Sequence, residues 1–202
     1  MPKSTLFAAL LLVAFASAAS AQQPPTVRIR GTIEAVDGAM LSIKSRDGAD
    51  MKVRTTDNVA VFGVAKTDLS QIKPGSYIGV TAMPEPDGTQ KAIAVHIFPE
   101  NQRGAAEGFR PWDLRANSTM TNATVAETVE GTDGQNITVK YKDGEKKVVV
   151  PPGTPVVTFV AGDKAELKPG AKIIIFGAVQ KEDGTLEANR VNVGRDGIAP
   201  PM

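Results

Sequence analysis

The residues best suited to binding chemistry lie in a short segment in the middle of the chain, residues 99–122. This segment holds the only tryptophan of the sequence beside charged and aromatic residues: Arg103, Phe109, Arg110, Trp112, Asp113 and Arg115. A flexible linker has little use for aromatic side chains next to arginines. These residues therefore either clamp the segment onto the rest of the protein, which is the simpler interpretation, or form a binding face for an anionic or aromatic partner.

A metal site is the second kind of chemistry to consider. The sequence has one histidine, His96, and no cysteine, so a zinc site of His and Cys ligands is not expected. Copper could use thioethers, with His96 and Met120 as ligands and Trp112 over the cation, as in small periplasmic copper-binding barrels. Other methionines lie in or beside expected strands, where a place in the core is the default: Met40, Met51 and Met83. We predict no metal and no cofactor, and keep copper-type binding through His96 and methionines as the alternative.

No catalytic residue is predicted. A Ser-His-Asp arrangement would have to use His96, and the sequence has no G-x-S-x-G motif. The sequence has seven Asp-Gly pairs, but none has the Asp and Glu spacing of a calcium-binding loop. Asp-Gly is favoured in tight hairpin turns, so we interpret the pairs as turns. The protein is predicted not to be an enzyme.

The elements that must position these residues come from an internal repeat. Lys73-Pro74-Gly75, an apolar strand and Asp87-Gly88-Thr89 return as Lys168-Pro169-Gly170, an apolar strand and Asp183-Gly184-Thr185. Such a repeat indicates two copies of one structural unit. We therefore expect a leader, a first barrel, a connector, a second barrel and a loose tail, which are residues 1–21, 22–98, 99–122, 123–194 and 195–202.

Each copy has the pattern of a small all-β unit. Val27, Ile29 and Ile33 alternate with polar residues, which is the period of a strand with one buried face. Short strands with regular turn signals, and a single helical turn at residues 67–72, favour a closed barrel, which leaves no exposed strand edge. We expect two tandem OB-like β-barrels joined by an irregular connector, with a β-sandwich as the alternative.

The N-terminus has the features of an export signal. Lys3 supplies a positive charge, residues 6–15 are apolar, and a small-residue cleavage site ends at Ala21. The apolar stretch is shorter than the ~20 residues of a membrane-spanning helix, so we expect cleavage near Ala21–Gln22 and a periplasmic or secreted protein without a membrane span. The formal net charge is +1, and this lack of excess cations argues against a nucleic-acid partner.

The repeat motifs resemble a family of exported bacterial domains of unknown function. The likeness rests on Gly31 and Ile33, the Lys-Pro-Gly turn, the apolar strand and the Asp-Gly-Thr turn, and it covers both copies. It implies tandem OB-like barrels and no catalytic residue. Alphaproteobacterial relatives with a similar connector sometimes carry the label metal-transport permease, which we do not adopt.

These observations predict a non-enzymatic binding or envelope-associated protein. The expected partner is an envelope protein, a glycan or a small ligand, and the connector residues are the candidate binding site.

Overall fold

The computed structural model describes residues 25–131 and 134–202. The predicted leader and Asp133, which belongs to one predicted turn, lie outside the described residues. The described chain forms short 3-10 helices, η1 Leu69–Gln71, η2 Glu100–Gln102 and η3 Lys164–Glu166, and the strands β1 Thr26–Asp37, β2 Met40–Ser45, β3 Asp50–Lys66, β4 Tyr77–Pro84, β5 Gln90–Ile97, β6 Gly108–Pro111, β7 Thr119–Gly131, β8 Gly134–Tyr141, β9 Gly144–Val150, β10 Val156–Ala161, β11 Lys172–Gln180 and β12 Leu186–Gly194.

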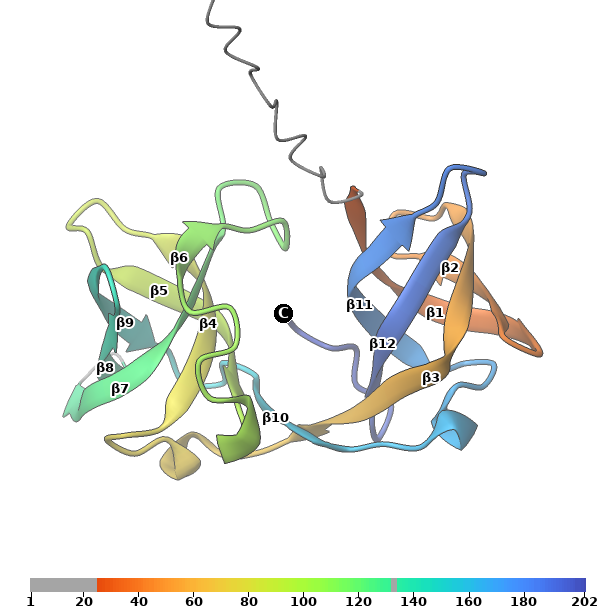
Figure 1. Cartoon of the computed structure of the whole chain (residues 1–202). Coiled ribbons are helices and arrows are strands. Elements are labelled where there is room, and N and C mark those ends of the chain that lie inside the picture. Colours follow the sequence, from red (N-terminus) through yellow and green to blue (C-terminus); the bar gives the residue numbers. More distant parts are fainter. Residues whose placement is uncertain (1–24, 132–133) are drawn as a thin grey trace, which may run out of the picture.

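The strands close into two five-stranded barrels that stand side by side (Figure 1). In the first barrel the order is β1-β2-β3-β12-β11, and β11 pairs with β1 to complete the circle. In the second barrel the order is β4-β5-β9-β8-β7, and β7 pairs with β4. Strand β6 pairs with β7 beside this barrel. The predicted all-β class with closed barrels, rather than a sandwich, is confirmed, and five strands is also the number in an OB-fold.

The two barrels do not follow the two sequence copies, so the predicted boundaries of residues 22–98 and 123–194 need correction. Each barrel takes three strands from one copy and two from the other. The cause is β3, a strand of 17 residues, which spans about 55 Å at 3.3 Å per residue. It leaves the first barrel and runs toward the second, where β4 begins (Figure 1). Strand β10 makes the return crossing.

Strands β3 and β10 cross as an antiparallel pair between the barrels. Val64 lies opposite Phe159, and the pairing extends two residues to each side. Equivalent strands of the two copies also have equivalent partners. Strand β1 pairs antiparallel with β11, and its counterpart β7 pairs antiparallel with β4. Likewise, β12 runs parallel to β3 as β5 runs parallel to β9 and β10. An approximate twofold axis through the Val64–Phe159 pair therefore relates the two copies.

Apolar side chains fill both barrels and the space between them. One cluster of buried residues, which includes Ile33 and Val53, lies in the first barrel, and another, which includes Val80 and Val139, lies in the second. A third cluster joins residues from both barrels: Val64, Met120, Val157, Phe159, Ile174 and Met202. Burial of this third cluster holds the barrels against each other.

The tail after β12, which we expected to be loose, packs between the barrels. Met202 is buried, and its backbone carbonyl accepts a hydrogen bond of 2.8 Å from Arg30 Nε. Lys172 Nζ donates to the carbonyl of Gly197 at 3.0 Å. Figure 1 shows the C-terminal end in the space between the barrels. The tail is therefore part of the third apolar cluster.

The described Asp-Gly pairs behave as turns. Asp87 Oδ1 accepts hydrogen bonds from the backbone N–H and the hydroxyl of Thr89, at 2.9 and 2.7 Å. Asp183 makes the same two contacts with Thr185, at 2.9 and 2.7 Å. These hydrogen bonds hold the pKa of both aspartates below the usual range. The predicted helical turn is η1, which Asp68 caps by accepting from the N–H of Ser70.

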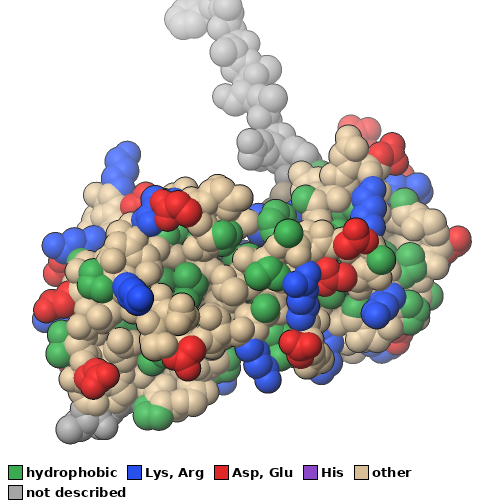
Figure 2. Space-filling model, turned by 90° about the horizontal axis from the view of Figure 1, so that it is seen from below, with side chains coloured by type: hydrophobic (Ala, Val, Ile, Leu, Met, Phe, Trp, Pro, Cys, Tyr) green, Lys and Arg blue, Asp and Glu red, His purple; other side chains and the backbone are tan. Residues whose placement is uncertain are grey.

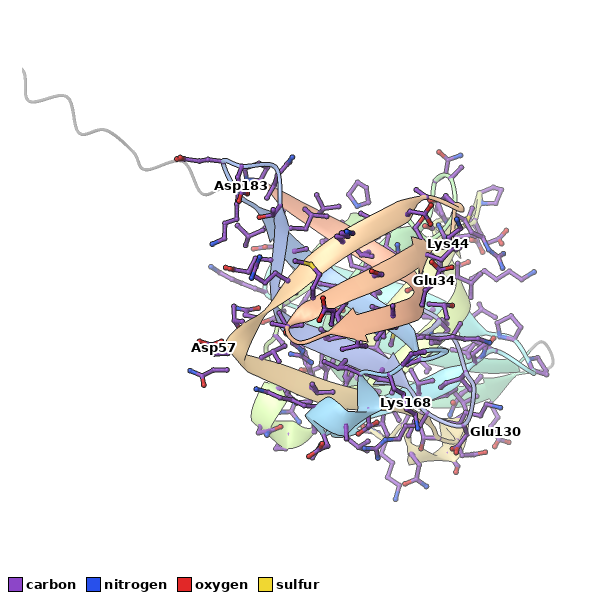
Figure 3. The ribbon with its side chains drawn as sticks, turned by 90° about the vertical axis from the view of Figure 1, so that its right-hand side faces the viewer. Glu34, Lys44, Asp57, Glu130, Lys168 and Asp183 are labelled. Atoms are coloured by element: carbon purple, nitrogen blue, oxygen red, sulfur yellow. The ribbon has the colours of Figure 1, made fainter. Side chains whose placement is uncertain are left out.

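Charges of both signs are mixed over the outer surface. On the face shown in Figure 2, acidic and basic side chains are interspersed. Figure 3 shows Glu34 and Lys44 close together on the outer face of the first barrel, and Asp57 and Asp183 at its periphery. Such mixed charges are typical of solvated faces. Among the described residues, none of the helical segments has the length and apolar character that a membrane crossing requires.

Candidate functional site

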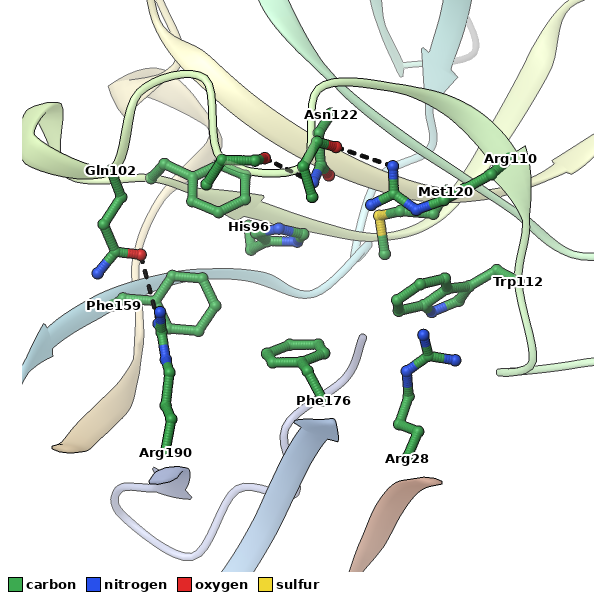
Figure 4. A pocket seen from close by; sticks show the side chains of 13 residues that line it. Arg28, His96, Gln102, Arg110, Trp112, Met120, Asn122, Phe159, Phe176 and Arg190 are labelled. Carbon is green, nitrogen blue, oxygen red and sulfur yellow. Dashed lines mark hydrogen bonds between the residues drawn. The ribbon is translucent and has the colours of Figure 1, made fainter. Parts of the chain in front are cut away.

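A cavity of about 320 Å³ lies between the two barrels and under the connector (Figure 4). This volume is at the lower end of the range for small-molecule pockets. Both barrels supply walls, because the crossing strands bring distant parts of the sequence together. Its lining consists of three arginines, four aromatic residues and a few smaller groups: Arg28, Arg110, Arg190, Phe98, Trp112, Phe159, Phe176, His96, Gln102, Met120, Asn122, Ala105 and Ala106.

Trp112, which follows β6, forms one end of the cavity together with arginines. The guanidinium carbon of Arg28 on β1 lies 3.7 Å from the Trp112 ring centroid, and that of Arg110 on β6 lies 5.6 Å away. Asp113 holds this end in place, through contacts of 2.8 Å to Arg28 Nη1 and 2.8 Å to Arg30 Nη2. Burial raises the pKa of Asp113, but hydrogen bonds from Arg30 and Arg28 outweigh burial and lower it to about 2. Asp113 therefore stays ionised and fixes the connector to β1.

Two of the cavity arginines, Arg110 and Arg190, have no carboxylate partner within residues 25–131 and 134–202. Arg110 Nη1 donates to the carbonyl of Ala106 at 2.8 Å. Arg190 Nη2 donates to Gln102 Oε1 at 3.3 Å, and its guanidinium carbon lies 4.1 Å from the ring centroid of Phe62. Burial lowers the pKa of both arginines, yet a guanidinium keeps its charge in proteins. Two partly buried cations thus face the cavity without a neutralising group.

His96 on β5 is neutral. It is 3% exposed, and burial, with a smaller contribution from Arg110, lowers its pKa to about 3. Its ring packs against those of Phe98 and Phe159, with centroids 4.6 and 5.5 Å away, and the two phenylalanine rings also contact each other at 5.8 Å. The ring fits because residue 79 on the neighbouring strand is glycine: a Cβ at Gly79 would overlap the imidazole. His96 is therefore an uncharged, flat part of the cavity wall.

Several buried polar atoms around the cavity have no hydrogen-bond partner within the described protein. They are Arg28 Nε, Trp112 Nε1 and Asn122 Oδ1. Asn122 is held in place on its other side, where Nδ2 donates to the carbonyl of Ala105 at 3.1 Å. A buried polar group without a partner costs about 1–3 kcal/mol. Two donors and one acceptor beside the cavity are therefore buried without a partner among the described residues.

Comparisons of the chain with protein-family models, curated proteins and solved structures return no match. The resemblance to exported tandem-barrel domains stays a prediction.

The structure separates the six connector residues predicted as a site. Arg110 and Trp112 line the cavity, and Asp113 lies behind them. Arg103 does not line it, since its Nη2 donates to Glu100 Oε2 at 2.7 Å and to the carbonyl of Gly75 at 2.9 Å. Phe109 is 39% exposed, with Lys146 Nζ 4.4 Å from its ring centroid. Arg115 is exposed, and its backbone N–H donates to Ser118 Oγ.

The prediction missed five cavity residues that lie on regular strands: Arg28, Asn122, Phe159, Phe176 and Arg190. Arg28 fits the polar half of an alternating pattern, so nothing in its neighbourhood marks it as functional. No local signal would have selected this set, because its arginines and its aromatic residues lie on different strands.

The two residues of the alternative metal site, His96 and Met120, both line the cavity (Figure 4). An imidazole and a thioether suit a soft metal such as Cu(I). However, no group of three or more His, Cys, Asp or Glu that could hold a metal ion is found among the described residues. Three guanidinium groups on the same lining also oppose the approach of a cation. The charge of the cavity favours an anion.

Proposed function

We propose that this protein is an exported, non-enzymatic binding protein, and that it holds a small anion with an apolar body between its two barrels. One observation carries the proposal: three arginines and four aromatic rings line the cavity, and no carboxylate does so among the described residues. Partly buried cations gain from a neutralising partner, and flat apolar walls suit a flat apolar body. Of the partners expected from the sequence, a small ligand fits a cavity of about 320 Å³ better than a protein or a glycan does.

The lining also supports a binding role over a catalytic one. The described lining contains neither a hydroxyl nor a carboxylate side chain. His96, with a pKa of about 3, is a poor general base near pH 7, where a base works best with a pKa close to the working pH. The lining residues are therefore suited to bind a molecule by its charge and shape.

Thermal melting of the mature chain in the presence of benzoate, terephthalate and benzamide tests the proposal. We expect the melting temperature to rise with the concentration of at least one carboxylate, because ligand that binds only the folded state stabilises it. The neutral amide, which matches the ring but lacks the charge, should shift it much less. Equal shifts for all three compounds, or no shift with either carboxylate, would refute an anion site.

Export is tested separately. The leader motif places cleavage near Ala21–Gln22, so N-terminal sequencing of protein from native cells should begin at or next to Gln22. Recovery of a chain that keeps Met1 would contradict export.

A further inference from the structure

The two arginines without a carboxylate partner approach the cavity from different barrels. Arg110 lies on β6, which pairs with the second barrel, and Arg190 lies on β12 of the first barrel. Figure 4 shows Arg190 at one side of the cavity and Arg110 at the other, beside Arg28 and Trp112. The positive charge is therefore divided between two ends.

Each end has its own hydrogen-bond donors. At one end, Arg110 lies beside Arg28 and Trp112, which also line the cavity and whose Nε and Nε1 are buried without a partner among the described residues. Asp113 neutralises only part of the charge there, because it is shared between Arg28 and Arg30. At the other end, Arg190 is oriented by Asn192 Oδ1 at 3.2 Å and Gln102 Oε1 at 3.3 Å. These two bonds use Nε and one hydrogen of Nη2, so the other N–H groups of this oriented guanidinium remain for a carboxylate.

The middle of the cavity is flat and uncharged. Figure 4 shows the rings of His96 and Phe176 between the two charged ends. Burial keeps the His96 imidazole neutral, and Phe159 packs edge-on against it with centroids 5.5 Å apart. Burying charge against such walls is costly, so negative charge belongs at the ends of a ligand rather than in its middle.

Resting on the proposed function, we infer that the ligand is a dianion with one anionic group at each end of a flat, apolar middle, as in an aromatic or unsaturated dicarboxylate. A monoanion would leave one guanidinium without a partner. A phosphate monoester would place both negative charges at one end and leave the other end uncompensated. The divided charge selects a ligand with two separated anionic groups.

Isothermal titration of the mature chain at fixed low ionic strength tests the inference, with terephthalate, benzoate and neutral terephthalamide as probes. We expect terephthalate to bind at least tenfold more tightly than benzoate, because it gains a second charge-assisted contact. Trans,trans-muconate, which is also flat and carries a carboxylate at each end, should follow terephthalate, and the neutral diamide should bind much more weakly than either.

Two variants locate the ends. Arg190→Gln should reduce terephthalate affinity at least tenfold while leaving benzoate nearly unchanged, because benzoate can stay at the Arg110 end. Arg110→Gln should weaken both. Arg54→Gln, at an exposed position on β3, is the matched control and should change neither. Circular dichroism and melting temperature verify folding of each variant, and the wild-type comparison of the three probes decides the question if a variant does not fold.

The outcomes separate this inference from the proposed function. If benzoate and terephthalate bind equally well and both exceed the diamide, the site takes a monoanion and the dianion inference is wrong. If neither carboxylate binds better than the neutral diamide, the proposed function itself fails.

Discussion

Two hairpins of the same design, β4–β5 and β11–β12, differ at one pair of equivalent positions. In the β4–β5 hairpin Gly79 lies opposite His96, and in the β11–β12 hairpin Ile174 lies opposite Asn192. Asn192 is satisfied in its own barrel, since Nδ2 donates to the carbonyl of Ile174 at 3.1 Å. His96 instead lies over the backbone of Gly79 and lines the cavity. At these equivalent positions the β11–β12 hairpin is closed, because Asn192 bonds within its own strand pair, and the β4–β5 hairpin is open to the cavity. Elsewhere β11 and β12 contribute Phe176 and Arg190 to the same lining.

The largest expected effect is on the closed hairpin. Ile174 is fully buried in the cluster between the barrels, so Ile174→Ala should lower the free energy of unfolding by about 2–5 kcal/mol through lost burial and a new cavity. Urea denaturation measures the loss. Val129→Ala, at a side chain that is 50% exposed, should change stability by less than about 0.5 kcal/mol.

On the open hairpin, the residue equivalent to Ile174 is Gly79, and the informative substitution enlarges it. Gly79→Ala places a methyl group where the His96 ring lies, and should cost about 1–3 kcal/mol from overpacking. Gly177→Ala on β11 is the matched control, because its nearest new contact would be Thr26 at an ordinary 3.8 Å. If the two glycine variants were equally stable, the close packing of His96 on β4 would be contradicted.

The burial of His96 against Gly79 also predicts that the free energy of unfolding depends on pH. The pKa of His96 falls from 6.5 to about 3 on burial. Below pH 6.5 the unfolded chain therefore binds a proton that the folded chain refuses, and stability is lost as the pH falls. One such group contributes up to about 1.4 kcal/mol per pH unit, or about 2 kcal/mol between pH 6.5 and 5.

Denaturation of wild type and His96→Gln at several pH values isolates this effect, since carboxylates contribute equally to both proteins. We expect the stability difference between them to shrink toward pH 5. A difference that stays constant from pH 7 to pH 5 would show that His96 is already free to protonate in the fold.

The connector lines the cavity together with the open hairpin. Substitution of Trp112 tests how much the packing of the connector contributes to stability. Trp112 is partly buried, with Arg28 over its ring and Phe176 6.5 Å away between centroids. Trp112→Ala should cost about 1–2 kcal/mol, below the 3–5 kcal/mol typical of a fully buried aromatic residue. In wild type, the tryptophan emission should be shifted to the blue, and terephthalate should protect it from acrylamide. Quenching that ligand does not change would place Trp112 outside the site.

The smallest expected effect is the binding of copper. His96 and Met120 share the cavity with three arginines, so calorimetric titration with Cu(I) should detect no one-to-one site of sub-micromolar affinity. A tight site that His96→Ala removes would instead support the metal alternative.

The sequence predicted the local structure well and the partners of the strands poorly. Alternation at Val27, Ile29 and Ile33 and the Asp-Gly turns depend on neighbouring residues only, and the structure contains these strands and turns. Local patterns do not show which copy supplies the strands that complete a barrel, because equivalent strands of a repeat present nearly the same edge to a pairing strand. The one local signal was the lack of Gly or Pro between Met51 and Phe62, which allows β3 to continue from one barrel toward the other.

The site was predictable where it interrupts the repeat and unpredictable where it lies within it. Arg110 and Trp112 were noticeable because no strand pattern explained them. Arg28 and Arg190 occupy ordinary strand positions, and they line the same cavity because the exchange of strands puts β12 in one barrel with β1.

The exchange of strands also fixes the order in which the barrels can be completed during synthesis. The second barrel needs nothing beyond β9, so it can close once Val150 is available. The first barrel has its opening strands ready at once but must wait for β11 and β12, since Thr26 pairs with Val179. Contacts so distant in sequence form slowly. The N-terminal strands therefore spend the longest time with open edges, and the barrel that is begun first is the one that is finished last.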